Sequence, residues 1–279
     1  MRRWVPQLPG TIALWAATVY FALPLVWMVT AAMKTQGELS VNPGFLVDDF
    51  ALGANLDTLF SRSGSIFGRW MLNSAIYAGV GAAVATLLAV PAGYAISKFR
   101  FRGREATFSL ILAGVMVPPA ALALPLFLMF AKMGLTNTYA SVLLPSMVAP
   151  LGVYLGRVTA DTSIPDELLE AAAVDGASPT RTFFSISFPL LRPVVITVFL
   201  FQLVAIWNNF MLPLVMLNTM SKYPVTLGLY NWSGQQLQEA AVLSSVITGS
   251  VLSIIPLIAG FLLLQRFWRT GMTVGSVKG

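Results

Sequence analysis

The sequence predicts an all-α integral membrane protein, and three observations lead to this fold class. Hydrophobic residues make up 57% of the 279-residue chain, charged residues make up only 10%, and the mean hydropathy is +0.77. About a quarter of the residues of a soluble domain are charged, so this composition excludes a soluble globular protein. The third observation is a series of long uncharged runs, which suit helices because a helix satisfies its own backbone hydrogen bonds in lipid.

Six runs contain no charged residue and are long enough to cross a membrane. They cover residues 11–33, 70–97, 106–131, 133–156, 193–221 and 240–265. A helix of about 20 apolar residues spans about 30 Å of hydrocarbon, and every run exceeds that length. We therefore expect residues 1–279 to form a single transmembrane domain of six helices. The first run is also longer than the roughly 7–15-residue apolar region of a cleaved signal peptide.

The distribution of Lys and Arg orients these helices. Of the 17 basic residues, 12 fall in the N-terminal segment, the loop after the second run, the loop after the fourth run and the C-terminal tail. Cytoplasmic loops are enriched in Lys and Arg, so these segments and both termini are expected in the cytoplasm. The positive charge is thus assigned to membrane orientation, and no nucleic-acid partner is expected. The opposite loop, residues 34–69, can carry a short helix around residues 52–60 that lies along the membrane or meets an external partner.

The cytoplasmic loop of residues 157–192 carries helix signals of its own. Ser163 can cap a first short helix, and Gly176 can end it. Ser178 followed by Pro179 can then start a second helix, with Ser as the cap and Pro in the first turn. The loop is therefore expected to form a helix-turn-helix between the fourth and fifth spans.

The corner of this helix-turn-helix is made of small side chains that leave the backbone open to another protein. Ala171, Ala172, Ala173, Gly176 and Ala177 form it. One interpretation is a solvated amphipathic loop. A docking site is favoured, because a solvated loop has no need of the apolar side chains that follow the corner.

The spacing of Glu170-Ala171-Ala172, Gly176, Ile186 and Pro189 resembles the EAA loop of the membrane subunits of binding-protein-dependent ABC importers. Phe188 departs from that pattern, which commonly has Leu there. Three further segments resemble the carbohydrate branch of the family, similar to maltose-type permeases. They are residues 207–214, 222–229 and 271–279. Asn209 is a second departure, because an acidic residue is frequent at that position.

The resemblance implies a division of labour between several chains. The implied partners are a second permease subunit, which the family favours as a different chain, two ATP-binding subunits and an external solute-binding protein that delivers a sugar. The chain has no Gly-Lys dipeptide and hence no P-loop, so ATP and Mg are expected on the partners and this chain is expected to be a non-catalytic subunit without a cofactor. The implied location is the plasma membrane of a bacterium or archaeon. The implied ATPase-coupling residues are Glu170, Ala171, Ala172, Asp175, Gly176, Ala177, Ile186 and Pro189.

Uncharged polar and aromatic side chains inside the runs are candidates for a sugar path, since hydroxyls need hydrogen bonds and sugar rings stack on aromatic rings. On a continuous helix, Asn73 shares a face with Tyr77, and Gln202 shares a face with Asn209. The full set of path candidates is Tyr77, Gln202, Asn209, Asn73, Trp207 and Asn208. The alternative for each is a hydrogen bond between helices, worth about 0.6 kcal/mol. That alternative is favoured for Asn73 and Asn208.

Other function classes lack the residues they need. The six runs hold no ionisable Asp, Glu, Lys, Arg or His, whereas ion-coupled secondary transporters commonly use such groups within the membrane. The absence of Cys and His argues against a metal site or an intramembrane Ser protease. A membrane scaffold would leave the small-residue corner unexplained. A permease for a non-sugar solute such as glycerol phosphate stays open.

Overall fold

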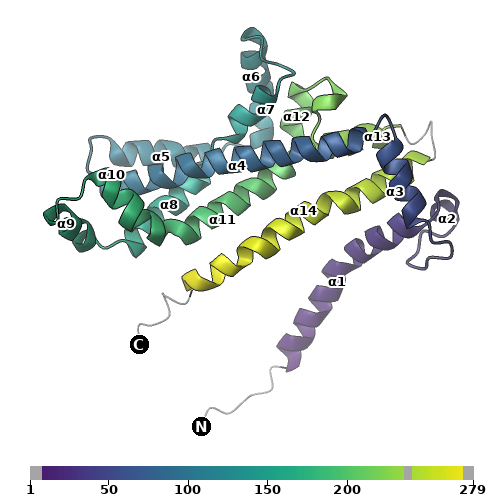
Figure 1. Cartoon of the computed structure of the whole chain (residues 1–279), viewed down its shortest axis with the longest axis horizontal. Coiled ribbons are helices and arrows are strands. Elements are labelled where there is room, and N and C mark those ends of the chain that lie inside the picture. The colour runs from purple at the N-terminus through teal and green to yellow at the C-terminus, as the bar shows by residue number, and fades with distance from the viewer. Residues whose placement is uncertain (1–7, 236–240, 273–279) are drawn as a thin grey trace. The chain divides into compact units, whose positions relative to one another are not determined.

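The chain is helical nearly throughout, in agreement with the predicted fold class (Figure 1). The structure is a computed structural model and describes residues 8–235 and 241–272, so the N-terminal Arg pair and the last seven residues of the C-terminal motif lie outside the described residues. Within the described part, the β-structure is one isolated bridge between Lys34 and Phe50. Contacts divide the chain into two units, residues 1–67 with 229–255 and residues 68–228 with 256–279.

Five described helices are long and apolar enough to span a membrane, and a bent pair of helices can supply a sixth span. The five spans are Gly10–Met33, Ile66–Lys98, Tyr139–Ser163, Pro179–Trp207 and Val242–Gln265. They correspond to α1 (Leu8–Met33), α4 (Ile66–Lys98), α7 (Tyr139–Ser146) with α8 (Pro150–Ser163), α10 (Pro179–Thr182) through α11 (Phe188–Trp207), and α14 (Ala241–Met272). These spans agree with the six predicted runs in number and order, and three of the runs differ in detail.

The run 106–131 is not one straight helix. It is split into α5 (Arg104–Val115) and α6 (Pro119–Lys132), which meet at an angle of 101°. The break lies at two consecutive prolines: Pro118 has extended backbone angles, as expected for a residue that precedes proline. Figure 1 shows α6 turning away from the direction of α5.

The run 133–156 begins later and ends later than predicted. Thr138 caps α7 by accepting a hydrogen bond from the N–H of Ser141, so the helix begins at Tyr139. The span then continues through α8 to Ser163. The prediction that Ser163 caps the next helix is therefore wrong, because this residue ends α8 and the cap position is occupied by Pro165.

The run 193–221 is displaced toward the N-terminus. Its helix already begins at Pro179 and ends at Trp207, and the remainder folds as α12 (Met211–Met216) and the 3-10 turn η2 (Met220–Lys222). The second arm of the predicted helix-turn-helix and the fifth span are thus one continuous helix.

Close packing of α4 on α8 organises the unit that contains the loop of residues 157–192. A methyl group added at Gly93 would lie 2.5 Å from the carbonyl oxygen of Val153, and one added at Gly156 would lie 3.0 Å from that of Val90. The two backbones therefore touch, as small residues allow in membrane helices. A buried cluster extends this packing to α11 through Leu191, and Figure 1 shows α4, α8 and α11 side by side.

The other unit is built on the end of α1. Two short helices follow, α2 (Gln36–Val41) and α3 (Leu52–Ser61), and the latter confirms the helix expected near residues 52–60. Asn55 is buried in α3, and its amide donates to the carbonyl oxygens of Ala32 and Lys34 at 2.8 and 2.9 Å. Ser244 of α14 donates to the Asn55 side-chain oxygen at 2.7 Å. These bonds fix the exit of the chain from α1.

Candidate functional site

The corner after α9 (Asp166–Val174) has the backbone geometry of a helix that ends on glycine. Gly176 has a φ of +78°. Its N–H donates to the carbonyl oxygen of Ala173 at 3.0 Å, and the N–H of Ala177 donates to that of Ala172 at 2.9 Å. This pair of bonds is the Schellman motif, which requires a left-handed residue at the position of Gly176. The glycine signal in the sequence is thus explained by the backbone.

The outer face of this corner is open. Glu170, Ala171, Asp175 and Gly176 are exposed, and a methyl group added at Gly176 would meet no atom within 4 Å. Val174 is also apolar and has 88% of its surface exposed. The corner therefore offers small and apolar side chains to a partner.

The inner face attaches the corner to the rest of the unit. Ala172 is buried, and Leu169 packs against the cluster of residues from α4, α8 and α11. A cavity of about 200 Å³ lies under the corner and is lined partly by Ala173 and Ala177. The corner is therefore divided into an anchored face and a free face.

The second arm begins at Ser178 and leads directly into a membrane span. The Ser178 side chain accepts a hydrogen bond from the N–H of Arg181, as predicted for a cap. Residues 183–187 then form a single π-helical turn, η1 (Phe183–Ser187), in which the N–H of Phe188 donates to the carbonyl oxygen of Phe183. The shifted hydrogen-bond register occurs beside Pro189, which has no N–H to donate. No loop interrupts the helix between the corner and the end of this span at Trp207.

Two of the coupling candidates lie on this arm. Ile186 and Pro189 are both half-buried. The arm is held by aromatic contacts, with the Phe183 ring 5.0 Å from that of Tyr94 and at an angle of 50° to it. Phe184 is 63% exposed and extends the open apolar surface of the corner.

An ion pair ties the first arm to α4. The Lys98 ammonium donates to the Asp166 carboxylate at 2.7 Å, and the Lys98 side chain is only 8% exposed. The hydrogen bond from Lys98 is the main cause that lowers the pKa of the Asp166 carboxyl below its ordinary value of 3.8. Nearby, the Ser97 hydroxyl donates to Asp161 at 2.5 Å. The end of α4 is thus bound to both sides of the α8–α9 junction.

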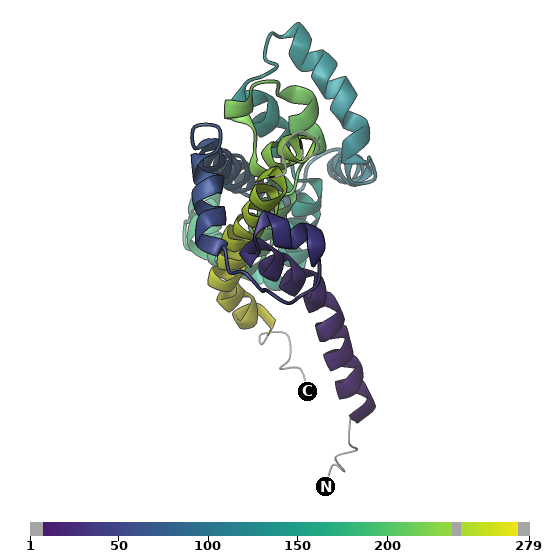
Figure 2. The same ribbon diagram turned by 90° about the vertical axis from the view of Figure 1, so that its right-hand side faces the viewer.

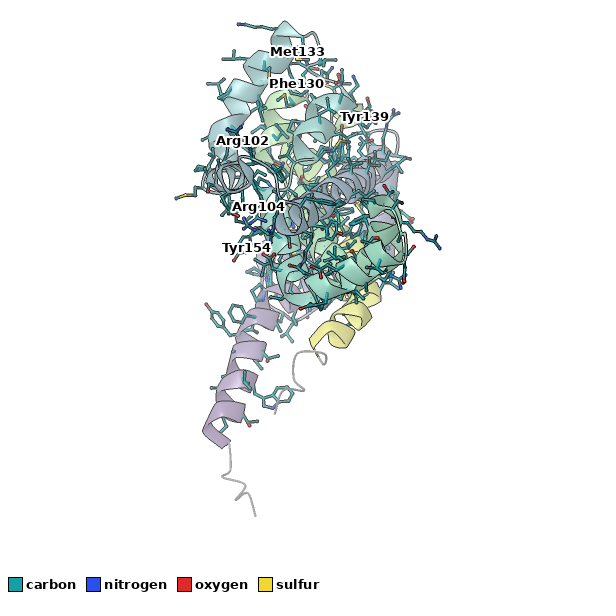
Figure 3. All side chains as sticks on the ribbon, turned by 90° about the vertical axis from the view of Figure 1, so that its left-hand side faces the viewer. Arg102, Arg104, Phe130, Met133, Tyr139 and Tyr154 are labelled. Atoms are coloured by element: carbon teal, nitrogen blue, oxygen red, sulfur yellow. The ribbon has the colours of Figure 1, made fainter. Side chains whose placement is uncertain are left out.

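A second ion pair joins α5 to α8. Arg157 makes two hydrogen bonds to the Glu105 carboxylate, at 2.8 and 3.0 Å, and its guanidinium lies 4.1 Å from the centre of the Phe108 ring. Figure 3 labels Arg104 of α5 and Tyr154 of α8, the two helices that this ion pair joins. The charge distribution of the sequence marks Arg157 only as one of the basic residues of a cytoplasmic loop. The sequence feature that indicates this ion pair is the opposite charge of Glu105 and Arg157, which lie at the ends of neighbouring uncharged runs.

Two path candidates on α4 are buried and have protein partners. Asn73 is 1% exposed, and its amide donates to the carbonyl oxygens of Ser221 and Tyr223, both at 2.9 Å. Its side-chain oxygen accepts from the Tyr139 hydroxyl at 2.7 Å. The Tyr77 hydroxyl donates to the carbonyl oxygen of residue 222 at 3.0 Å, and its side chain is 2% exposed. Both side chains therefore fix the segment around η2.

The candidates near the end of α11 do not form the predicted common face. Gln202 lies within α11, but the helix ends at Trp207 before Asn209 is reached. The Asn209 side chain accepts from the N–H of Leu212 at the start of α12. Trp207 is buried, and the exposed Asn208 donates to the carbonyl oxygen of Val204.

Gln202 faces a cavity. Its amide donates to the carbonyl oxygen of Val148 at 3.3 Å, in the break between α7 and α8. The cavity of about 270 Å³ also reaches Gly114 and Pro119, which flank the break between α5 and α6. Two helix breaks therefore meet at one largely apolar cavity in which Gln202 supplies a polar side chain.

Comparison with known proteins decides the family. The model of the family described as "Binding-protein-dependent transport system inner membrane component" matches residues 85–269. The chain belongs to this family. The matched residues include the whole loop of residues 157–192 and the residues that line the cavity at Gln202.

Curated relatives resemble this inner membrane component over nearly its whole length. The arabinooligosaccharides transport system permease protein AraQ of Halalkalibacterium halodurans is 33% identical, over 95% of this chain and 96% of the relative. The lactose transport system permease protein LacG of Rhizobium radiobacter is 31% identical, over 100% of this chain and 98% of the relative.

A solved structure supports the fold of this inner membrane component. A chain of a bacterial ABC transporter involved in the import of alginate superposes with a TM-score of 0.80 at 21% identity, covering 96% of this chain and 99% of that chain. The family match and the curated relatives confirm the resemblance to an ABC importer permease inferred from the EAA spacing.

Proposed function

We propose that this inner membrane component is the permease subunit of a carbohydrate ABC importer and forms half of its translocation pathway. The observation that carries the substrate class is the set of relatives named for arabinooligosaccharides, lactose, and melibiose, raffinose and stachyose, each aligned over 95% or more of this chain. The absence of a P-loop supports the assignment of ATP hydrolysis to partner subunits that hold ATP and Mg.

The corner after α9 is proposed as the surface that receives an ATPase subunit. Its free face carries Glu170, Ala171, Asp175 and Gly176, and its other side continues without a loop into α11. Docking there would let nucleotide-driven movement reach a membrane span directly. The assembly would contain a second permease chain, two ATPase subunits and an external solute-binding protein, in the bacterial inner membrane with both termini of this chain in the cytoplasm.

Gln202 is proposed as the leading path residue of this chain. It combines a polar side chain with a cavity where two helices are broken, and broken helices at membrane depth are tolerated where they line a cavity. The next path candidates of this chain lie at the end of α11 and just after it: Asn209, Trp207 and Asn208. Asn73 and Tyr77 would act through the position of the η2 segment instead.

A second substrate class rests on one specific relative. The osmoprotective compounds uptake permease protein GgtD of Synechocystis is 31% identical over 98% of this chain. A small osmoprotective solute is therefore the alternative to a sugar.

The test is reconstitution of the complete assembly in proteoliposomes with its solute-binding protein. We expect uptake of a radiolabelled oligosaccharide or disaccharide, and ATP hydrolysis stimulated by the same compound. Stimulation by osmoprotective solutes with no response to any sugar would favour the second class. No response to either class would contradict the proposed function.

A further inference from the structure

The segment that follows α1 has a fixed shape organised by a buried lysine. Within residues 34–50, the Lys34 side chain has no exposed surface, and its ammonium donates to the carbonyl oxygens of Asn42 at 2.7 Å and Gly44 at 2.8 Å. The ammonium also lies 3.6 Å from the Glu38 carboxylate. A buried charge is costly unless it is paired and hydrogen-bonded, so this arrangement holds the loop in one conformation.

The loop turns back along α1. The Trp27 indole N–H donates to the carbonyl oxygen of Pro43 at 2.7 Å. Trp27 lies six residues before Met33, which is about 9 Å along a helix. The 24-residue apolar span Gly10–Met33 would measure about 36 Å, against about 30 Å of hydrocarbon. Pro43 is thus held beside a part of α1 near the edge of the hydrocarbon layer, and Figure 2 shows α2 and its loop at that end of α1.

Three consecutive carbonyl groups of the returning segment are satisfied by the protein itself. The carbonyl groups of Asn42, Pro43 and Gly44 all accept hydrogen bonds from the two side chains named above. Further along, the N–H of Asp48 donates to the Glu38 carboxylate at 2.8 Å. Such internal pairing allows this backbone to lie at a depth where little water is available.

The same segment exposes large apolar side chains. The exposed fractions are 86% for Val41, 47% for Phe45, 74% for Leu46 and 72% for Phe50. Trp and Tyr are enriched where membrane helices meet water, and Trp27 is bonded to Pro43 of this segment.

We propose that Val41, Phe45, Leu46 and Phe50 insert into the lipid headgroup region and anchor the segment 34–50 to the bilayer surface where α1 ends. The occupant of this surface is phospholipid. Asp48 and Asp49 are exposed on the same segment and remain on its water side. The anchor would set the depth of α1 in the bilayer. The large apolar side chains of α1 are exposed over its whole length.

The chain contains no cysteine, so a single introduced cysteine gives one labelling site. Phe45→Cys and Leu46→Cys are each labelled with an environment-sensitive fluorophore in the complete assembly, built with cysteine-free partner subunits and placed in phosphatidylcholine–phosphatidylglycerol vesicles. We expect blue-shifted emission and stronger quenching by lipids with a spin label near the headgroup than by lipids with one near the chain end. Asp49→Cys is the control, because Asp49 is exposed on the same segment and is assigned to its water side, so its label should show water-like emission.

Three outcomes would overturn the proposal. One is water-like emission at both positions without lipid quenching. Another is shielding that arises only when the solute-binding protein is added, which would make the segment a protein docking site. The third is a blue shift at both positions that arises from contacts between two copies of the assembly and not from lipid.

Trp27→Phe tests the tether separately. It removes the indole N–H that holds Pro43 and keeps an aromatic ring in α1. We expect the quenching at residue 45 to fall in this background. Unchanged quenching would contradict the role given to Trp27.

Discussion

At the scale of single residues, the structure of the corner after α9 depends on backbone conformation rather than on internal packing. Gly176 has a left-handed φ, yet a side chain there would enter open space. Substitution should therefore strain the corner moderately and obstruct whatever binds to it. The chain provides a matched control, because Gly134 ends α6 with a φ of +68° and also has no atom within 4 Å of an added methyl group.

Gly176→Leu should abolish substrate-stimulated ATP hydrolysis and weaken co-purification of the ATPase subunit. A non-glycine residue in the left-handed region costs about 1–2 kcal/mol, which leaves the membrane spans intact. Gly134→Leu imposes similar strain at another loop and should keep both activities. Equal losses in the two variants would mean that backbone strain, and not docking, explains the effect.

Asp166→Asn should loosen α9 from α4 by weakening the bond to Lys98. Because the folded pKa of Asp166 is lowered, the contribution of this pair is present above the unfolded value of 3.8 and is lost as the pH falls through the lower folded value. Hydrogen exchange of the α9 amides, corrected for intrinsic rates, should rise in Asp166→Asn and should stay constant between about pH 5 and 8 in the parent. Glu167→Gln, at the neighbouring exposed acid, is the control, and an equal rise there would contradict a specific role for the pair.

At the scale of secondary-structure elements, α4 and α8 form a contact that admits no side chain. The atoms that would meet a methyl group at Gly93 are backbone atoms of α8, so the helices would have to separate. Gly79 lies on the same helix and has no neighbour within 4 Å of an added methyl group. Gly93 and Gly79, two of the glycines of α4, thus differ in the space around them.

Gly93→Ala should destabilise the permease by about 1–3 kcal/mol, the usual cost of overpacking. Gly79→Ala should be neutral or slightly stabilising, since alanine favours helix more than glycine does. Thermal unfolding in detergent, followed by size-exclusion chromatography of the fluorescently tagged assembly, measures both. A destabilisation of Gly79→Ala as large as that of Gly93→Ala would show that helix propensity or a partner chain dominates.

At the scale of the whole molecule, the proposed function assigns the passage of the solute to this chain and the supply of energy to other chains. It carries spans, a cavity with a polar side chain and an open corner, but no phosphate-binding glycine loop. Under the proposed function, its transport cycle is driven through contacts with other chains.

The purified chain alone should neither bind nor hydrolyse ATP, whereas the complete assembly should hydrolyse ATP in response to substrate. Equilibrium dialysis with labelled nucleotide and a phosphate-release assay measure these two properties. Saturable nucleotide binding by the isolated chain would contradict the proposed division.

The sequence alone determined the helical membrane class and the turn at Gly176 in the loop of residues 157–192. Each rests on local physics: a span must satisfy its own hydrogen bonds in lipid, and Gly176 and Ser178 act on backbone groups a few residues away. The bend at Pro118, the end of α11 at Trp207 and the true position of Ser163 required the structure, because apolar runs do not record where a helix breaks.

The hydrogen-bond partners of the polar side chains inside the spans were decided only by tertiary structure. Asn73 bonds to carbonyl groups about 150 residues away, so its amide has partners within the chain. Gln202 has the same kind of amide but meets a cavity between two broken helices. A polar side chain in a membrane must find a partner, and the sequence does not state whether that partner is another segment of the chain or a transported solute.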